Sequence, residues 1–346
     1  MTGTLKILLL SSVALAAAAC SRDAAAPANE APAAAAAAAS AGEIVRLDPA
    51  VDALIAPDAQ VEKVATGFKF TEGPLWRDGR LWFADLVGNQ MLAVTPDGQV
   101  ELLIDKAGGL ENPPEGAYLG SNGMVTDKDG SVLMTQHGLR RIARLDDKLA
   151  ATTFLDKFEG KRLNSPNDLV FSSDGVLWFT DPPYGLAGQD EDPAKEIPFN
   201  GVYRYADGKL TAVIKDLPRP NGLGFSPDGK TLYVANTGPE MFIRKYPVAA
   251  DGTVGPGTNL ITFTEADGPG VPDGLKIDTA GNVWASGPGG ITIVSPDGKK
   301  LGVIKLPEVA ANIAWADDGK TAYITGSTSI YRVKLAGRGQ MPLYQR

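Results

Sequence analysis

The stretch NGLGFSPDGKTLYVANTG, residues 221–238, contains two short strand-like runs joined by a tight turn. The first run is apolar, the turn is built on Asp-Gly, and the second run is rich in Leu, Tyr and Val, which is the pattern of a β-hairpin. The stretch opens with the amide side chain of Asn221. An Asn before a Gly is ordinary in a turn, so the meaning of this one depends on whether the pattern recurs.

The same pattern occurs six times along the chain. The six segments begin at Glu72, Asn122, Asn167, Asn221, Asp273 and Asn312, at intervals of 39 to 54 residues. Each is followed by two further strand-like runs, such as GVYRYADGKLTAVIKDL after the third segment. Four strands in each period of about fifty residues, with turns in place of helices, are typical of β-propeller blades. The sequence therefore predicts an all-β fold, a six-bladed β-propeller.

A propeller must also close its ring. The run VEKVATGF, residues 61–68, precedes the first blade, and the run SIYRVKL, residues 329–335, ends the last one. We expect these two runs to pair with each other. Such a pairing joins the first and last blades and leaves no free sheet edge between them.

Residues 1–20, MTGTLKILLLSSVALAAAAC, have the layout of a secretory signal peptide: one Lys, an apolar run and a string of small residues. The stretch resembles a bacterial lipoprotein signal, in which Cys20 becomes the lipidated N-terminus, although Ala17 stands where that signal usually has Leu. The alternative is cleavage by an ordinary signal peptidase. We therefore expect export, to the periplasm or as a membrane-anchored lipoprotein of a bacterium, with membrane contact only through that N-terminal lipid.

Residues 21–42 are mostly Ala, and Pro27 and Pro32 argue against a continuous helix, so this segment is predicted to be a flexible linker. Residues 43–346 then form the propeller domain. The formal net charge of −8 and the lack of any long Lys/Arg run exclude nucleic acid as a partner. With a single cysteine there is no internal disulfide, and we expect a monomer.

The opening residues of the six segments point to a metal site. The first strand of a propeller blade runs beside the central channel, so these six residues should meet at one face. All six are carboxylates or amides, and buried carboxylates need a partner. Oxygen ligands suit Ca²⁺ above all, with Mg²⁺, Mn²⁺ and Zn²⁺ as alternatives. A zinc site of His and Cys is nearly excluded, because the chain has only His137 and Cys20. For any single residue, closing a turn is an equally good explanation; for all six together it is a poor one.

Four motifs resemble the senescence marker protein and gluconolactonase family of six-bladed propellers, over about residues 60–335. They are TEGPLW, RLNSPNDLVFSSDGVLWFTDPPYGL, PNGLGFSPDGKTLYVANT and PDGLKIDTAGNVWAS, and the longest of them is most similar to bacterial gluconolactonases. The resemblance implies a divalent metal held by Glu72, Asn167, Asn221 and Asp273. It also implies hydrolysis of a small sugar lactone such as glucono-1,5-lactone, in which the metal polarises the carbonyl and activates water. Asp273 is then the candidate general base.

Further candidates rest on single residues. His137, at the end of an inner-hairpin strand, is a candidate for catalytic proton transfer, and the alternative is a structural histidine. Asn122, Arg162 and Tyr184 are candidates for substrate binding. The alternatives are that Asn122, like Asn312, closes a turn and that Arg162 is a solvated loop residue. The tyrosine ring is expected to stack on the sugar.

The insertion AGQDEDPAKEIPFN, residues 187–200, is too long for a hairpin turn and is expected to form part of a lid or, alternatively, an exposed acidic loop. Two other functions remain open. One is a broad lactonase or phosphotriesterase of the paraoxonase type, and the other is a non-enzymatic propeller that binds a ligand on its upper face. The intact set of four metal-ligand candidates argues against the non-enzymatic alternative.

Overall fold

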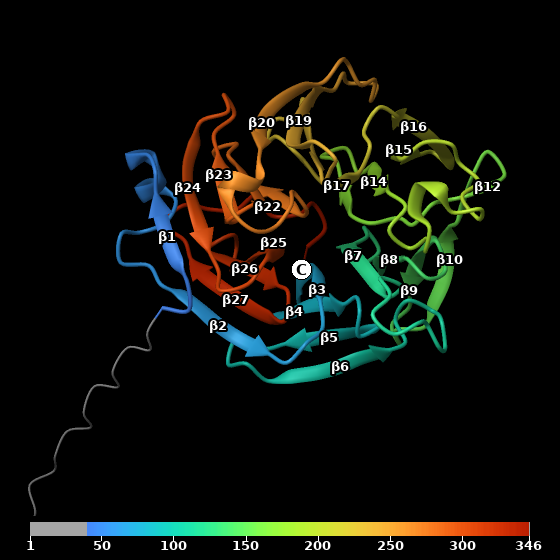
Figure 1. Ribbon diagram of the computed structural model, residues 1–346, viewed down its shortest axis with the longest axis horizontal. Helices are drawn as coiled ribbons and strands as arrows, with labels where there is room; N and C mark the ends of the chain where they lie inside the picture. The colour runs from blue at the N-terminus through green and yellow to red at the C-terminus, as the bar shows by residue number, and fades with distance from the viewer. Residues whose placement is uncertain (1–39, 346) are drawn as a thin grey trace, which may run out of the picture. The chain divides into compact units, whose positions relative to one another are not determined.

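Six antiparallel sheets stand around a central channel in the computed structural model, which describes residues 40–345 (Figure 1). This arrangement confirms the six-bladed β-propeller predicted from the repeat. Cys20, the predicted signal peptide and residues 21–39 of the predicted linker lie outside the described residues. In the part of the chain that is described, no helix is long and apolar enough to cross a membrane.

The blades follow one another along the chain, and in blades 1 to 5 the four strands run outward from the channel in chain order. Blade 1 contains β3 (Thr71–Arg77), β4 (Arg80–Asp85), β5 (Gln90–Val94) and β6 (Val100–Asp105). Blade 2 contains β7 (Ser121–Thr126), β8 (Val132–Gln136), β9 (Arg141–Leu145) and β10 (Ala151–Leu155). Blade 3 contains β13 (Leu169–Phe171), β14 (Leu177–Asp181), β15 (Gly201–Ala206) and β16 (Lys209–Ile214).

The second half of the ring repeats this order. Blade 4 contains β17 (Pro220–Phe225), β18 (Thr231–Asn236), β19 (Met241–Pro247) and β20 (Thr258–Phe263). Blade 5 contains β21 (Leu275–Ile277), β22 (Val283–Gly287), β23 (Gly290–Val294) and β24 (Lys300–Lys305). Blade 6 contains β25 (Ala310–Ala316), β26 (Thr321–Gly326) and β27 (Ser329–Lys334). The remaining elements are the two-stranded pair β11 (Lys157–Phe158) and β12 (Lys161–Arg162) and the 3-10 helices η1 (Pro49–Ala53), η2 (Gln189–Glu191) and η3 (Glu265–Asp267).

The N-terminal part of the domain closes the ring. Strand β2 (Val61–Thr66) is the outer strand of blade 6 and pairs antiparallel with β27, with Val61 opposite Val333. The predicted pairing of residues 61–68 with residues 329–335 is therefore confirmed. The sequence did not predict β1 (Glu43–Arg46), which adds a fifth strand to the outside of blade 5 by pairing with β24.

Aromatic side chains pack blade against blade. In three pairs of neighbouring blades, an aromatic ring on the second strand of one blade meets a ring on the first strand of the next. The pairs are Trp178 with Phe225, Trp284 with Trp315 and Tyr323 with Trp76, with ring centroids 5.2 to 5.4 Å apart. Such contacts add to the burial of apolar surface that drives folding. The last of these pairs joins blade 6 to blade 1 and so helps to close the ring.

Candidate active site

The six opening residues lie at the same end of their blades. Glu72, Asn122 and Asn221 are the second residues of their strands, and in each case a register shift in the strand pairing follows at once. Asn167 and Asp273 each stand two residues before the first strand of their blade. These departures from regular pairing, which β-bulges commonly make beside active sites, free four of the opening residues from the ladder, whereas Glu72 and Asn312 stay opposite Ala84 and Thr325.

Glycine follows four of the six opening residues, because neighbouring blades approach each other there. The N–H of Gly222 donates to the carbonyl of Asp273 at 3.0 Å, and a Cβ at residue 222 would stand 2.5 Å from that same oxygen. Gly123 relates to the carbonyl of Asn167 in the same way, with a hydrogen bond of 3.0 Å. The Asn-Gly and Asp-Gly pairs thus serve contact between blades rather than a hairpin turn.

In several blades, a polar side chain at the end of the second strand holds the loop that leads to the opening residue. Asp181 accepts hydrogen bonds from the backbone N–H groups of Asn164 and Ser165, both at 2.8 Å, just before Asn167. In blade 1, Asp85 does the same for the two residues before β3. The Asp181 carboxyl is fully enclosed, and burial raises its pKa to about 7. Each of these blades therefore fixes its own ligand candidate from within.

Three of the amides form a directed chain of hydrogen bonds around the channel. Nδ2 of Asn122 donates to Oδ1 of Asn167. Nδ2 of Asn167 donates to Oδ1 of Asn221 at 2.6 Å, and Nδ2 of Asn221 donates to Oγ1 of Thr237 at 2.9 Å. Thr237 in turn donates to the carbonyl of Pro272 at 2.9 Å. The predicted convergence of these side chains on the channel is thus present, and all three asparagines are buried.

Asn312 takes a different orientation from the other amides. Its Oδ1 accepts from the backbone N–H of Ile313 at 2.8 Å and from Nζ of Lys276 at 3.3 Å, and both of these groups can only donate. Its Nδ2 therefore faces Oε2 of Glu72, at 3.0 Å. Asn312 orients the Glu72 carboxylate and offers no free oxygen to a cation.

The six opening residues form a ring of polar side chains around the channel, which is called the ring below. Two carboxyl groups in it, from Glu72 and Asp273, adjoin each other. Glu72 is 2 % exposed, and its Oε1 has no hydrogen-bond partner. Burial raises the Glu72 pKa to about 7. Asp273 is half-buried, and burial followed by repulsion from Glu72 and Asp168 raises its pKa well above the ordinary value. Both carboxyl groups therefore resist ionisation unless a cation joins them.

Lys276 already supplies one positive charge beside the ring. Its Nζ lies 3.6 Å from Oδ2 of Asp168, the residue that follows Asn167. With Glu72, Asp273 and Asp168 ionised and Lys276 protonated, these four side chains carry a net charge of −2. A divalent cation would balance that charge.

The donor set fits an oxygen-ligated divalent metal. The unpartnered Oε1 of Glu72 and the repelled carboxyl of Asp273 are the groups that a cation would satisfy, and Asn167 and Asn221 add amide oxygens. Carboxylate and amide oxygens are the ligands of hard cations such as Ca²⁺. No three His, Cys, Asp or Glu side chains of residues 40–345 cluster as a metal-binding group, so the amides are essential to any such site.

His137 lies against this ring but is enclosed. It is 1 % exposed, and its Nδ1 is 3.1 Å from the carbonyl of Tyr118, so Nδ1 carries the proton and Nε2 is a free acceptor beside the Asn167 side chain. Burial lowers the pKa of His137 to about 4. The imidazole is therefore neutral at physiological pH.

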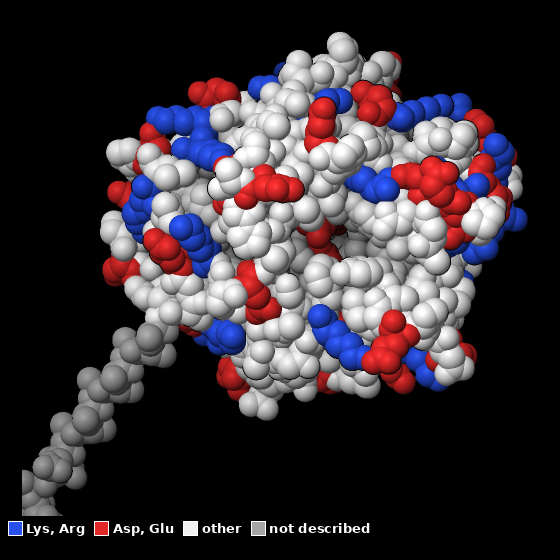
Figure 2. All heavy atoms as spheres, in the orientation of Figure 1, with Lys and Arg blue, Asp and Glu red and all other residues white. Residues whose placement is uncertain are grey.

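An open pocket of about 820 Å³ lies beside the ring, between blades 3 and 4. Tyr184 and Thr237 line it, and the Tyr184 hydroxyl is buried next to Asn221 without a partner of its own. The face of the molecule drawn in Figure 2 is hollowed near its middle, and acidic side chains lie on the floor of the hollow. Of the three predicted substrate-binding residues, Tyr184 is the one that lines this pocket.

The insertion at residues 187–200 forms one wall of this pocket, in the connection between β14 and β15. Asp190 anchors it, because this carboxylate makes an ion pair with Arg219 and accepts from Nδ2 of Asn200 at 2.8 Å. Arg219 also donates to Oε1 of Gln189 at 3.0 Å. The insertion is thus tied to the start of blade 4, and its role as a lid stays a prediction.

Arg162 is not among the residues that line the pocket. It belongs to β12, which lies at the periphery of the propeller in Figure 1. Its guanidinium donates to the carbonyl of Leu139 at 3.2 Å, and its backbone N–H donates to Glu196. Substrate binding by Arg162 therefore stays a prediction that these contacts do not support.

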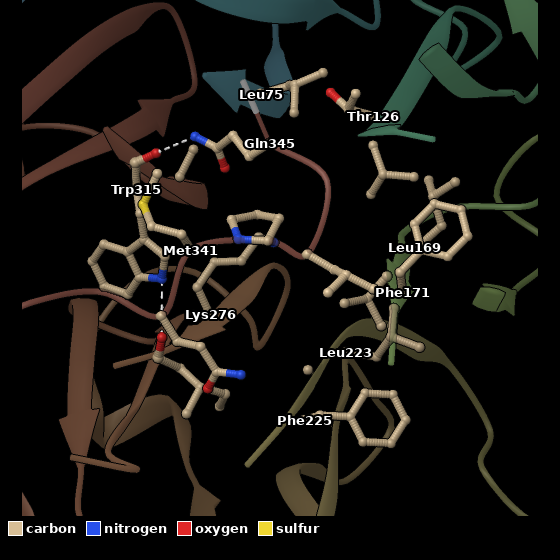
Figure 3. Close-up of a pocket in the computed structure, with 18 of the residues that line it drawn as sticks. Leu75, Thr126, Leu169, Phe171, Leu223, Phe225, Lys276, Trp315, Met341 and Gln345 are labelled. Atoms are coloured by element: carbon tan, nitrogen blue, oxygen red, sulfur yellow. Dashed lines mark hydrogen bonds between the residues drawn. The ribbon is translucent and has the colours of Figure 1, made fainter. Parts of the chain in front are cut away.

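A cavity of about 150 Å³ continues the channel on the side of Lys276 and Asp168 (Figure 3). The C-terminal residues 340–345 line it. Nε2 of Gln345 donates to the carbonyl of Trp315 at 2.8 Å, and the ring of Tyr344 packs edge-on against Phe171 with centroids 5.1 Å apart. This C-terminal segment lines the cavity and takes no part in the wall of the open pocket.

Sequence reasoning missed Thr237, Lys276 and the C-terminal segment. Thr237 belongs to the quoted motif but stands at the end of the second strand, and only the fold brings it to Asn221. Lys276 is a single basic residue three positions after Asp273, in a strand otherwise apolar. The repeated polar residue at the end of the second strand, seen in Asp85, Asp181 and Asn236, was a signal that could have found the loop anchors.

The chain is similar to known proteins in both sequence and fold. The family model of the SMP-30/Gluconolactonase/LRE-like region matches residues 70–328. A gluconolactonase from Zymomonas mobilis is 37% identical over 85% of this chain and 86% of its own. A 6-deoxy-6-sulfogluconolactonase from Pseudomonas putida is 28% identical over 74% of this chain and 82% of its own. The solved structure of a gluconolactonase from Xanthomonas campestris has a TM-score of 0.74 and 31% identity, covering 84% of this chain and 94% of that one. The chain therefore belongs to the SMP-30/gluconolactonase/LRE-like family.

Proposed function

We propose that this protein is a metal-dependent sugar lactonase that hydrolyses an aldonolactone such as glucono-1,5-lactone. The observation that carries the proposal is the ring in which the carboxyl groups of Glu72 and Asp273 meet the amides of Asn167 and Asn221 beside an open pocket. The similar proteins described above are named as lactonases of glucono- or sulfoglucono-lactones. Their shared substrate class is a sugar lactone.

Glu72, Asn167, Asn221 and Asp273 would hold the cation, with Ca²⁺ as the preferred ion for this all-oxygen set. When bound, such a cation supplies Lewis acidity at the ester carbonyl. Asn312 keeps the Glu72 carboxylate in place through its hydrogen bond of 3.0 Å.

Asp273 is the candidate general base. It is half-buried, unlike Glu72, so its carboxylate is the one of the two that water can reach. It would take a proton from the water that attacks the carbonyl carbon. The C–O bond of the lactone then breaks, and the departing oxygen takes that proton from Asp273, which gives the open-chain hydroxy acid and restores the base.

Tyr184 and Asn122 would bind the hydroxyl groups of the sugar. The Tyr184 hydroxyl is unpartnered, while Asn122 spends its Nδ2 on Asn167 and keeps its oxygen for a donor. For His137, enclosure and a pKa of about 4 favour a role as an acceptor beside Asn167 over proton transfer.

The test is hydrolysis of glucono-1,5-lactone by the purified chain from Ser40, followed by acid release, before and after metal removal and after Ca²⁺ is restored. We expect turnover above the spontaneous rate that disappears with the metal and returns with Ca²⁺. Metal binding without turnover of sugar lactones would transfer the chemistry to other esters or phosphotriesters. If the protein showed neither metal binding nor turnover, the remaining function would be that of a ligand-binding propeller.

A variant of Asp273 tests whether this residue is the base. Asp273→Asn keeps the shape and an oxygen ligand but removes the proton acceptor, so we expect kcat at saturating Ca²⁺ to fall by about 10²- to 10⁴-fold. Full activity in this variant would show that another group is the base.

We also propose export with lipidation at Cys20, which rests on the sequence alone. Expression of the full chain and of Cys20→Ser in a bacterium, followed by membrane fractionation, tests it. The expected result is a membrane-bound parent and a variant that leaves the membrane fraction. Identical partition of the two would exclude a lipid on Cys20.

A further inference from the structure

We infer that Thr237 is a positioning residue that fixes which end of the Asn221 amide faces the metal site. This inference rests on the proposed function, because it concerns the affinity of the same ring for a cation. Thr237 is not itself one of the candidate ligands, but it fixes the orientation of one of them.

The carbonyl of Pro272 fixes the direction of the hydrogen bonds at Thr237. The backbone carbonyl of Pro272 can only accept a hydrogen bond, and it lies 2.9 Å from Oγ1 of Thr237. The single proton of the Thr237 hydroxyl is therefore committed to Pro272. Toward Asn221, at 2.9 Å, the same hydroxyl can only accept.

The orientation of Asn221 follows from this commitment. The amide must present Nδ2 to Thr237, which turns its Oδ1 toward the ring, where it accepts from Asn167 at 2.6 Å. An amide rotated by half a turn would point its NH₂ group into the ring. An NH₂ group carries no lone pair for a cation, so the rotated form is useless as a ligand.

Thr237 also connects two of the proposed ligands. Its hydroxyl contacts Asn221 of blade 4 on one side and, on the other, the peptide that immediately precedes Asp273 of blade 5. Mutation of residues that orient metal ligands in this way typically lowers metal affinity by about 10- to 100-fold.

The experiment measures Ca²⁺ affinity by titration calorimetry on the chain from Ser40, for the parent and five variants. Thr237→Val removes the hydroxyl and should raise the Kd for Ca²⁺ by about 10- to 100-fold. Thr237→Ser keeps the hydroxyl and should stay within about threefold of the parent. Thr231→Val, the same substitution at the other end of β18 (Thr231–Asn236), is the matched control and should leave the Kd unchanged.

The remaining variants separate amide polarity from packing. The two oxygens of a carboxylate are equivalent, so Asn221→Asp has no wrong orientation, and adding Thr237→Val to it should change the Kd by less than about threefold. An equal loss in both backgrounds would overturn the inference, as would a parent-like Kd in Thr237→Val. If the Val variant does not fold, Thr237→Ala replaces it in the same comparison. A parent chain that binds no Ca²⁺ would instead contradict the proposed function.

Discussion

The amide side chains around the channel are not equivalent, although all four belong to the same residue type. Asn312 has its oxygen occupied by two obligatory donors, whereas Asn221 has its nitrogen occupied by an obligatory acceptor. The first is thereby a donor to Glu72 and the second a potential cation ligand. Which end of an amide faces a site is decided by the donor capacity of its neighbours, and residue type alone does not reveal it.

Glu72 should be indispensable for the cation. Glu72→Gln keeps the shape but removes one of the two ligand charges, so we expect the Kd for Ca²⁺ to rise by more than about 100-fold, beyond the loss typical of a residue that merely orients a ligand. Lactone hydrolysis at low Ca²⁺ should be lost with it. Titration calorimetry and the acid-release assay measure the two effects.

Glu101→Gln serves as the control for this change, since Glu101 lies exposed on β6 and makes an ion pair with Arg80. It should alter neither quantity. A Glu72→Gln variant with parent-like Ca²⁺ affinity would remove Glu72 from the set of ligands.

At the residue scale, the sequence revealed the ring but not its surroundings. The six opening residues were identified because they recur at one position of a repeat, and the structure brings Asn122, Asn167 and Asn221 into contact. Thr237 and Lys276 have no such repeat. They reach the ring only because neighbouring blades place them there, which pairing within one blade does not predict.

At the scale of elements, the contact between the first strands of neighbouring blades can be tested directly at Gly222. A methyl group at this position would stand 2.5 Å from the carbonyl of Asp273 and 2.6 Å from the nitrogen of Leu275. Both are backbone atoms that cannot move independently. We expect Gly222→Ala to lower the free energy of unfolding by about 1–3 kcal/mol and to weaken Ca²⁺ binding, because the blade carrying Asp273 is pushed away.

Gly238→Ala is the matched control in the same blade, because a Cβ there meets nothing within 4 Å. Urea unfolding followed by circular dichroism gives the stability of both variants. Equal stabilities would mean that blades 4 and 5 separate without cost.

The order of the strands within the blades was predictable from the sequence. The segments that are added to the blades, β1 and the C-terminal residues, were not. Turn residues and alternating apolar residues mark the four strands of a blade locally, so the repeat is visible in the sequence. Strand β1 and the C-terminal segment have no counterpart in the other blades. Their positions depend on contacts between residues such as Glu43 and Lys305, which are distant in the chain.

For the whole molecule, closure of the ring depends on β2. This strand completes blade 6 by pairing with β27, more than 260 residues later in the chain. A chain that begins at Gly67 would lack it and expose the edge of β27. Compared with the chain from Ser40, we expect it to unfold at a clearly lower temperature and to associate through that edge. Thermal unfolding and size-exclusion chromatography test this; identical behaviour would show that blades 1 and 6 hold together without β2.

Metal removal should also change the way the stability of the whole molecule depends on pH. Without a cation, the pKa of Glu72 is raised to about 7 from an ordinary value of 4.5, and that of Asp273 is raised in the same direction. Between about pH 4.5 and pH 7 the folded chain therefore keeps protons that the unfolded chain has released, so the contribution of these groups to stability falls as the pH rises through this window. Bound Ca²⁺ holds both carboxyl groups ionised and removes the effect.

The measurement is the midpoint of thermal unfolding of chelator-treated and Ca²⁺-saturated protein from pH 5 to pH 8. Asp181, with a pKa of about 7, acts in the same sense as Glu72, while buried His137 acts in the opposite sense, and both contribute equally to the two series. We therefore expect the stabilisation by Ca²⁺ to be small at pH 5 and to grow as the pH rises through about 7. In Glu72→Gln the growth should be much weaker. A stabilisation by Ca²⁺ that is independent of pH would show that the two carboxyl groups do not meet at the cation site.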